Sequence, residues 1–160
     1  MIIENKKRTL DVRKRRFLFG ILLATVVVLI AYLDFFDDKI VGLTRYAFIA
    51  ICVGIFLGYY LWGLILDYNY CYFNDLGSKI VFKYYSLAPL SKQHHSIEIE
   101  KHHFQKYTVK TAFFGLRNHL ILYQKASGGI AKYPPISLGL FTEEERNRII
   151  KSLELFTKLT

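Results

Sequence analysis

Cysteine is scarce in this sequence, which has only two among 160 residues. Cys52 lies inside a long apolar run and Cys71 lies just beyond its end, so a disulfide would join a bilayer position to an aqueous one. We therefore expect two free thiols, and a reducing cytoplasm around the C-terminal part of the chain.

The sequence also lacks the short motifs of common enzyme classes. It has no G-x-x-x-x-G-K phosphate loop, no G-x-G-x-x-G dinucleotide fingerprint and no paired-cysteine motif. Neither Cys71 nor any serine lies in a recognisable nucleophile context. Glu143, Glu144 and Glu145 are adjacent carboxylates, but they suit the positive end of a helix. We therefore predict no enzymatic activity, no catalytic or metal-binding residue and no cofactor.

Charge is missing from two long stretches. Residues 17–33 and 46–66 contain no charged side chain, and two phenylalanines extend the first stretch to residue 36. About 20 helical residues, at about 1.5 Å each, span the roughly 30 Å of hydrocarbon in a bilayer. The sequence therefore predicts membrane-spanning helices over 17–36 and 46–66. The first run exceeds the core of a typical signal peptide and is not followed by a small-residue cleavage motif.

Basic residues collect on one flank of the first run. Residues 1–16 carry seven Lys or Arg against two acidic residues, whereas the connection 37–45 carries Asp37 and Asp38 with only two basic residues. Because Lys and Arg favour the cytoplasmic ends of membrane helices, we expect 37–45 outside and both termini in the cytoplasm. The predicted basic anchor at the membrane surface is formed by Arg13, Lys14, Arg15 and Arg16. Specific binding of anionic lipid is the alternative reading of this cluster.

Small residues recur four positions apart in both apolar runs, as Gly20 with Ala24 and as Gly54 with Gly58. This spacing lets helix backbones approach closely in lipid, where apolar surface alone does not drive association. We expect these residues at helix–helix contacts, either within the pair or with a second copy or a partner subunit. No ionisable residue lies in the middle of either run, which argues against an ion or proton pathway.

Beyond residue 66 the pattern changes from continuous apolarity to alternation, which is typical of strands. Turn residues at 74–78 predict a hairpin close to the second apolar run. The predicted strands cover residues 68–72, 79–85, 96–100, 104–111, 119–125, 130–133 and 136–140.

The last segment has the period of a helix. Thr142 followed by Glu145 matches a capping box, and apolar residues recur at helical spacing from Ile149 onward. We therefore expect residues 67–160 to form a strongly bent antiparallel sheet or open barrel capped by a C-terminal helix.

Three segments carry a family resemblance, which covers residues 67–160. They read KIVFKYYSLAPLSKQHHSIEIEKHHFQKY, HLILYQKASGGIAKYPPISLGL and EEERNRIIKSLELF. Their strand order, the Ile136-Ser137-Leu138 run and the closing helix resemble bacterial membrane proteins with a pleckstrin-homology-like (PH-like) domain. The resemblance implies a binding scaffold without enzymatic activity, in a bacterial cytoplasmic (inner) membrane, and it assigns no ligand residue.

Two residue patterns in this domain are typical of binding sites, one for metal ions and one for nucleic acid. Paired histidines at His94, His95, His102 and His103 have imidazole ligands for zinc, copper or nickel. Adjacent strand residues point to opposite faces, so four ligands cannot converge without a bend. Lys and aromatic residues also alternate as in single-stranded nucleic-acid binders. Amphipathic strands produce the same pattern, so we expect no nucleic-acid partner. We expect solvated or partly packed strand histidines, with a metal site or a pH-responsive role as the alternatives.

The function expected from these features is binding beside the membrane. In the leading hypothesis the cytoplasmic PH-like domain binds a protein, a peptide or a lipid head group. In the alternative the chain is a small structural accessory subunit of a larger membrane complex, with its apolar helices as the interface to a partner or to further copies. A third hypothesis is a membrane-bound enzyme that uses the histidine cluster.

Overall fold

The computed structural model describes residues 1–32, 44–88, 91, 93–113, 115–126 and 128–157. These residues form two compact units, one of residues 10–65 and one that joins residues 1–9 to residues 66–160. Positions 33–36 of the first predicted span, and most of the predicted outer loop 37–45, lie outside the described residues.

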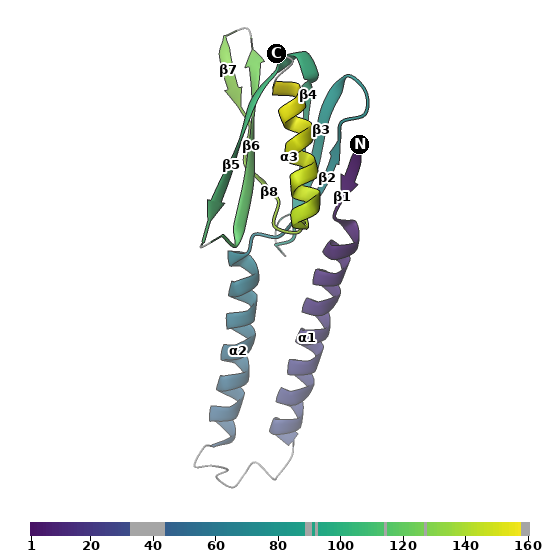
Figure 1. The fold of residues 1–160 in the computed structure, drawn as a ribbon. Helices are drawn as coiled ribbons and strands as arrows, with labels where there is room; N and C mark the ends of the chain where they lie inside the picture. Colours follow the sequence, from purple (N-terminus) through teal and green to yellow (C-terminus); the bar gives the residue numbers. More distant parts are fainter. Residues whose placement is uncertain (33–43, 89–90, 92, 114, 127, 158–160) are drawn as a thin grey trace. The chain divides into compact units, whose positions relative to one another are not determined.

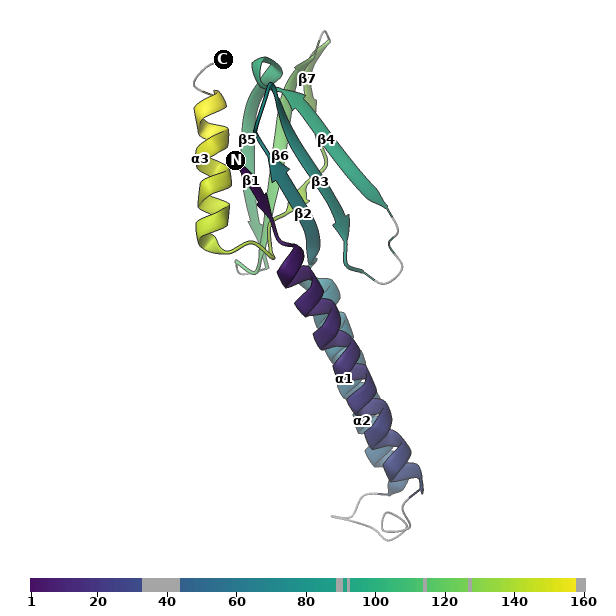
Figure 2. The same ribbon diagram turned by 90° about the vertical axis from the view of Figure 1, so that its right-hand side faces the viewer.

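Two long helices make up the first unit. They are α1 (Lys6–Tyr32) and α2 (Arg45–Ile65), and each is long and apolar enough to cross a membrane. Figures 1 and 2 show them side by side and antiparallel. The ring centroids of Phe19 and Tyr59 are 4.3 Å apart, and Arg16 donates a hydrogen bond of 3.2 Å to the Gly63 carbonyl.

The start of α1 differs from the prediction. The helix begins at Lys6, well before the apolar run at residue 17, whereas α2 agrees with its predicted range within a residue. Lys, Arg and Leu are good helix formers, and neither proline nor glycine occurs before Gly20. The apolar run marks the segment suited to lipid, and not the ends of the helix.

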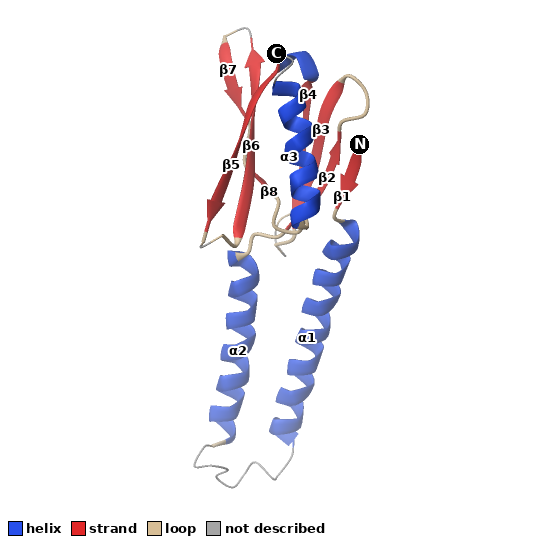
Figure 3. Ribbon diagram, viewed as in Figure 1, coloured by secondary structure: helices blue, strands red, loops and turns tan. Residues whose placement is uncertain are grey.

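Two antiparallel sheets form the second unit (Figure 3). The first has the order β1-β2-β3-β4, with β1 (Ile2–Glu4), β2 (Asn69–Asn74), β3 (Lys79–Ser86) and β4 (His94–Glu100). The second has the order β5-β6-β7, with β5 (Phe104–Ala112), β6 (Arg117–Ala126) and β7 (Gly129–Lys132), and β8 (Ile136–Ser137) also pairs with β6. A 3₁₀ turn, η2 (Lys101–His103), joins the two sheets.

The helix α3 (Glu143–Thr157) lies beside both sheets, across the opening between them (Figures 1 and 2). Its Ile149 and Leu153 are fully buried and complete a core to which both sheets contribute. The capping box is confirmed, because the Thr142 amide donates to Glu145 and the Glu145 amide donates to the Thr142 hydroxyl. The core of the unit contains Cys71, Phe73, Ile80, Phe82, Tyr84, Ile97, Ile99, Phe104, Leu120, Leu122, Ile136, Leu138, Phe141, Ile149 and Leu153.

The first nine residues belong to the sheet unit. The sequence predicted residues 1–16 as a basic flank and limited the domain to residues 67–160. Strand β1 pairs with β2, with Ile3 opposite Phe73. Asn5 is 1% exposed, and its side chain donates to the Asn69 carbonyl and accepts from the Cys71 amide. The domain is therefore built from chain segments on both sides of the helical pair.

The coarse architecture predicted from the sequence is confirmed: two long apolar helices, antiparallel sheets and a C-terminal helix. All seven strands predicted after residue 66 are present, and the predicted turn at 74–78 connects β2 to β3. In that turn the Asn74 side chain accepts from the Leu76 amide, and Gly77 has a φ of +99°, a conformation that favours glycine.

Candidate functional site

The outer face of the first sheet carries aromatic side chains. On β2, alternation turns Cys71 and Phe73 into the core, where both are fully buried, and turns Tyr70 and Tyr72 outward. The same alternation on β3 buries Phe82 and leaves its neighbours Lys83 and Val81 on the outer face.

One row of this face contains three rings on three adjacent strands. Tyr70 is opposite Tyr85 in the register of β2 and β3, and Tyr85 is opposite His94 in that of β3 and β4. Their ring centroids are 4.7 Å apart for the two tyrosines and 4.9 Å apart for Tyr85 and His94. These distances are those of contacting aromatic pairs, so the rings form a continuous apolar strip.

Charged groups surround the strip. Lys83 lies in the next row, between Tyr72 and Ser96, and its side chain is exposed. The Tyr70 hydroxyl donates a hydrogen bond of 3.2 Å to Glu4 on β1. Burial and the Glu4 carboxylate raise the pKa of Tyr70 to about 12, so this phenol remains a neutral donor.

These side chains line a shallow depression of about 620 Å³ on the sheet surface. Its lining combines flat ring faces with a lysine cation and, on β1 and β4, the carboxylates of Glu4 and Glu98. Ligand sites typically pair apolar surface with a few placed polar groups, and the depression has both. The strip was not predicted from the sequence, although the spacing of Tyr70 and Tyr72 by two was the available signal.

The histidine pairs have separate surroundings. On β4, His94 contacts Tyr85, and His95 contacts Tyr84 with ring centroids 5.1 Å apart, so both rings of this pair lie against tyrosines of β3. His102 and His103 lie in η2, where strand alternation does not apply, and their ring centroids are 4.0 Å apart. The expectation that the four histidines bind no common ion stays a prediction, and the 3₁₀ turn brings the second pair together.

The four small residues of the predicted helix contacts divide into two groups. Gly20 and Ala24 line a space of about 250 Å³ between α1 and α2, and Gly20 lies 4.0 Å from the Phe56 ring, measured from a Cβ built on the glycine. A Cβ built on Gly54 or Gly58 would meet nothing within 4 Å among the described residues. Their role in helix packing therefore stays a prediction about contacts outside this chain.

The predicted basic anchor is part of α1. Arg13, Lys14, Arg15 and Arg16 continue the helix before its apolar segment, and Arg16 reaches the α2 backbone at Gly63. Within the hairpin unit, Arg16 therefore joins the two helices. The cluster also supplies basic side chains at the predicted membrane surface.

One group resembles a hydrolase triad by residue type alone. The His119 ring contacts the Asp67 carboxylate at 3.0 Å, and Ser137 is opposite His119 in the register of β6 and β8. The Ser137 hydroxyl, however, is 1% exposed and donates to the main-chain carbonyl of Asp67 at 2.8 Å. We interpret the group as a structural contact that holds the segment following α2, where Asp67 has a φ of +47°.

Comparison with protein-family models, curated proteins and solved structures gave no match for this chain. Its function is therefore inferred from its own residues.

Proposed function

We propose that the chain is a membrane-anchored binding module without enzymatic activity, whose cytoplasmic sheet domain binds a peptide segment of a partner protein. The observation that carries this proposal is the depression on the first sheet, where the Tyr70–Tyr85–His94 strip lies beside Lys83. An aromatic strip favours an apolar, proline or aromatic side chain, and a lysine favours a nearby carboxylate.

The architecture supports a PH-like assignment of the domain. Two antiparallel sheets followed by one C-terminal helix are the features that the sequence resemblance implies for such a domain. Folds of this kind host many functions, so the residues of the site, and not the fold, indicate the ligand class.

The sheet also supports a topology in which both termini lie on one side of the membrane. Strand β1 precedes α1 and strand β2 follows α2, yet the two strands are hydrogen-bonded neighbours. A chain that leaves a sheet and returns to it crosses a membrane an even number of times. The basic cluster before the apolar run favours the cytoplasm as that side.

A selection from displayed random peptides tests the proposal, with the full chain held in nanodiscs of neutral lipid. We expect selected peptides to combine an apolar or aromatic residue with one Asp or Glu that meets Lys83 and lies away from Glu4 and Glu98. Tyr85→Ala should weaken binding roughly tenfold, as expected for a residue that contributes more than about 1 kcal/mol. Lys83→Ala should weaken it by up to about fivefold, because an exposed ion pair contributes up to about 1 kcal/mol. Lys110→Ala, on β5 of the other sheet, is the matched control and should change little. Peptides that bind all four proteins equally would contradict the proposed site.

Anionic lipid is a second candidate ligand, favoured by a different surface. Residues 101–142 contain six Lys or Arg and no Asp or Glu. The register places Lys106, Lys132 and Lys110 on the outer face of the second sheet, around Tyr123 and His119. Glycerol phosphate, used as a soluble head-group probe, should then bind the wild type and lose affinity in Lys110→Ala but not in Lys83→Ala.

A further inference from the structure

The turn between the two sheets is fixed by buried neighbours. Ile99 before it and Phe104 after it are both fully buried. The Lys101 amide donates to the Ser78 carbonyl at 3.0 Å, and the Lys101 side chain donates to the Asp75 carbonyl at 2.8 Å. These contacts hold the backbone of η2 against the core, so the side chains on its outer surface start from a defined position.

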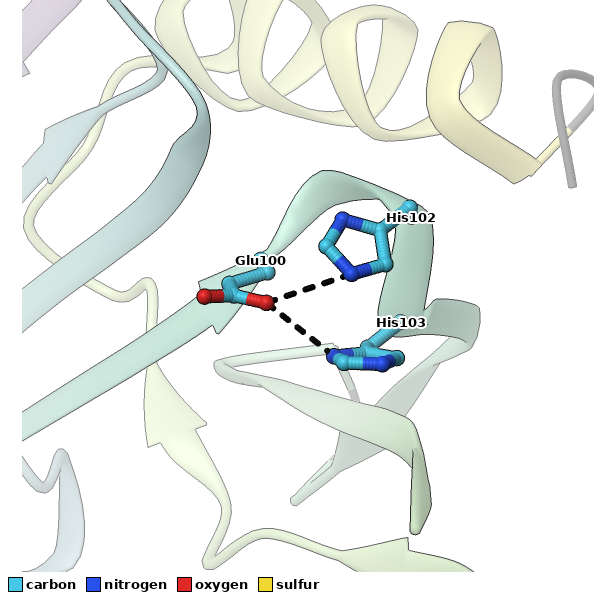
Figure 4. A group of neighbouring side chains, drawn as sticks. All are labelled: Glu100, His102 and His103. Atoms are coloured by element: carbon cyan, nitrogen blue, oxygen red, sulfur yellow. Dashed lines mark ion pairs between the residues drawn. The ribbon is translucent and has the colours of Figure 1, made fainter.

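Three donor atoms converge on that outer surface. An oxygen of Glu100 lies 3.2 Å from Nε2 of His102 and 3.3 Å from Nδ1 of His103, and all three donor atoms lie within 4.8 Å of one another (Figure 4). All three side chains are at least partly exposed to solvent, so an ion can reach them without unfolding.

The separations match those of metal ligands. Around a tetrahedral zinc ion with bonds of about 2.0 to 2.1 Å, neighbouring ligand atoms are roughly 3.3 Å apart. The two oxygen–nitrogen distances already have this length, and the two nitrogens lie within 4.8 Å of each other, so an ion can gather all three donors by rotation of exposed side chains. Two imidazoles and one carboxylate are also a donor set that zinc accepts, with water in the remaining position.

We propose that Glu100, His102 and His103 form a binding site for a divalent transition-metal ion, with zinc as the ion that suits this donor set. The site is separate from the peptide depression, whose lining includes none of these three residues. Bound metal links three side chains of the turn that joins the sheets, and it stabilises the folded domain by mass action.

Zinc titration of the untagged full chain in detergent, after removal of metal by a chelator, tests the site. Competition with a chromophoric zinc indicator should show one saturable zinc per chain. His102→Ala and His103→Ala should each weaken binding by at least about tenfold, since even loss of a group that supports a metal ligand has an effect of that size. Glu100→Gln should weaken it in the same direction, and the double variant His94→Ala with His95→Ala is the matched control that keeps wild-type affinity.

Two further measurements separate a defined site from weak surface binding. Cobalt(II) should give visible absorption bands of a four-coordinate ion in the wild type, and these bands should disappear in His102→Ala. Zinc should raise the thermal unfolding midpoint of the wild type and leave that of His102→Ala unchanged, which also shows that the variant folds. Equal zinc affinity in the wild type and in His102→Ala, or less than one zinc per chain at saturation, would overturn the proposal.

Discussion

Asn5 connects the N-terminal segment to the sheet domain through one small side chain. Its amide donates to the Asn69 carbonyl at 3.0 Å, while its oxygen accepts from the Cys71 amide at 2.9 Å and from the Thr9 hydroxyl at 3.2 Å. A buried amide with both ends used in this way is sensitive to truncation, because each former partner then lacks a hydrogen bond. The contact also fixes the start of α1, which begins at the next residue.

Replacing Asn5 by Ala should destabilise the sheet domain by about 1 to 3 kcal/mol for each buried polar group left without a partner. Pulse proteolysis of the full chain in detergent measures this loss, with cleavage after residue 66 reporting domain unfolding. Asn147→Ala is the matched control, since Asn147 is exposed on α3. A domain equally resistant in both variants would show that the Asn5 contacts do not stabilise it.

Element positions were largely predictable because the strands after residue 66 are amphipathic and are separated by turn residues. Alternation located β2 to β8, and the capping box located the start of α3 at the residue after Thr142. Strand β1 was missed because it has three residues and is followed by a strongly basic segment. It forms because β2 supplies a partner, which is tertiary information that a local pattern does not contain.

The candidate sites were less predictable than the strands for the same reason. The aromatic strip depends on the register that aligns Tyr70, Tyr85 and His94, and a shift of one residue would turn these rings to the other face. Convergence of Glu100 with His102 and His103 depends on a 3₁₀ turn, and the pattern of paired histidines does not include Glu100. Composition indicated the residue types, and the backbone decided which of them meet.

On α3, Leu153→Ala should destabilise the domain by about 2 to 5 kcal/mol, because it removes a fully buried side chain from a core shared by both sheets. Leu155→Ala is the matched control, since that leucine is 63% exposed on the same helix. Denaturant unfolding of the full chain in micelles, followed by tyrosine fluorescence, compares them. Similar unfolding midpoints for the two variants would mean that the face of α3 that carries Leu153 does not pack into the core in solution.

At the scale of the whole molecule, the two chain segments of the sheet unit come before and after the helical pair in the sequence. Arg8 donates two hydrogen bonds to the Glu145 carboxylate, of 2.5 and 3.1 Å, and one to the Leu140 carbonyl. The N-terminal segment therefore contacts the start of α3 as well as β2. Within the sheet unit, the two ends of the chain depend on each other for their structure.

On the proposed topology, reporters fused to the two termini should give the same answer. A reporter active only in the cytoplasm should give signal at Met1 and at Thr160, because β1 and β2 must meet in one compartment. A reporter inserted at residue 40, within the predicted outer loop, is the control and should be silent. Opposite signals at the two termini would contradict both the topology and the pairing of β1 with β2.

Strand β1 is made before both long helices, whereas its partner β2 is made only after them. Until then β1 and the buried amide of Asn5 have no partner in the sheet, and contacts so distant in sequence form slowly. A ribosome that stops within α2 leaves a chain whose first strand has nothing to pair with. Closure of the sheet by β1 therefore waits for both helices, so a closed sheet occurs only in molecules whose helical pair has been completed.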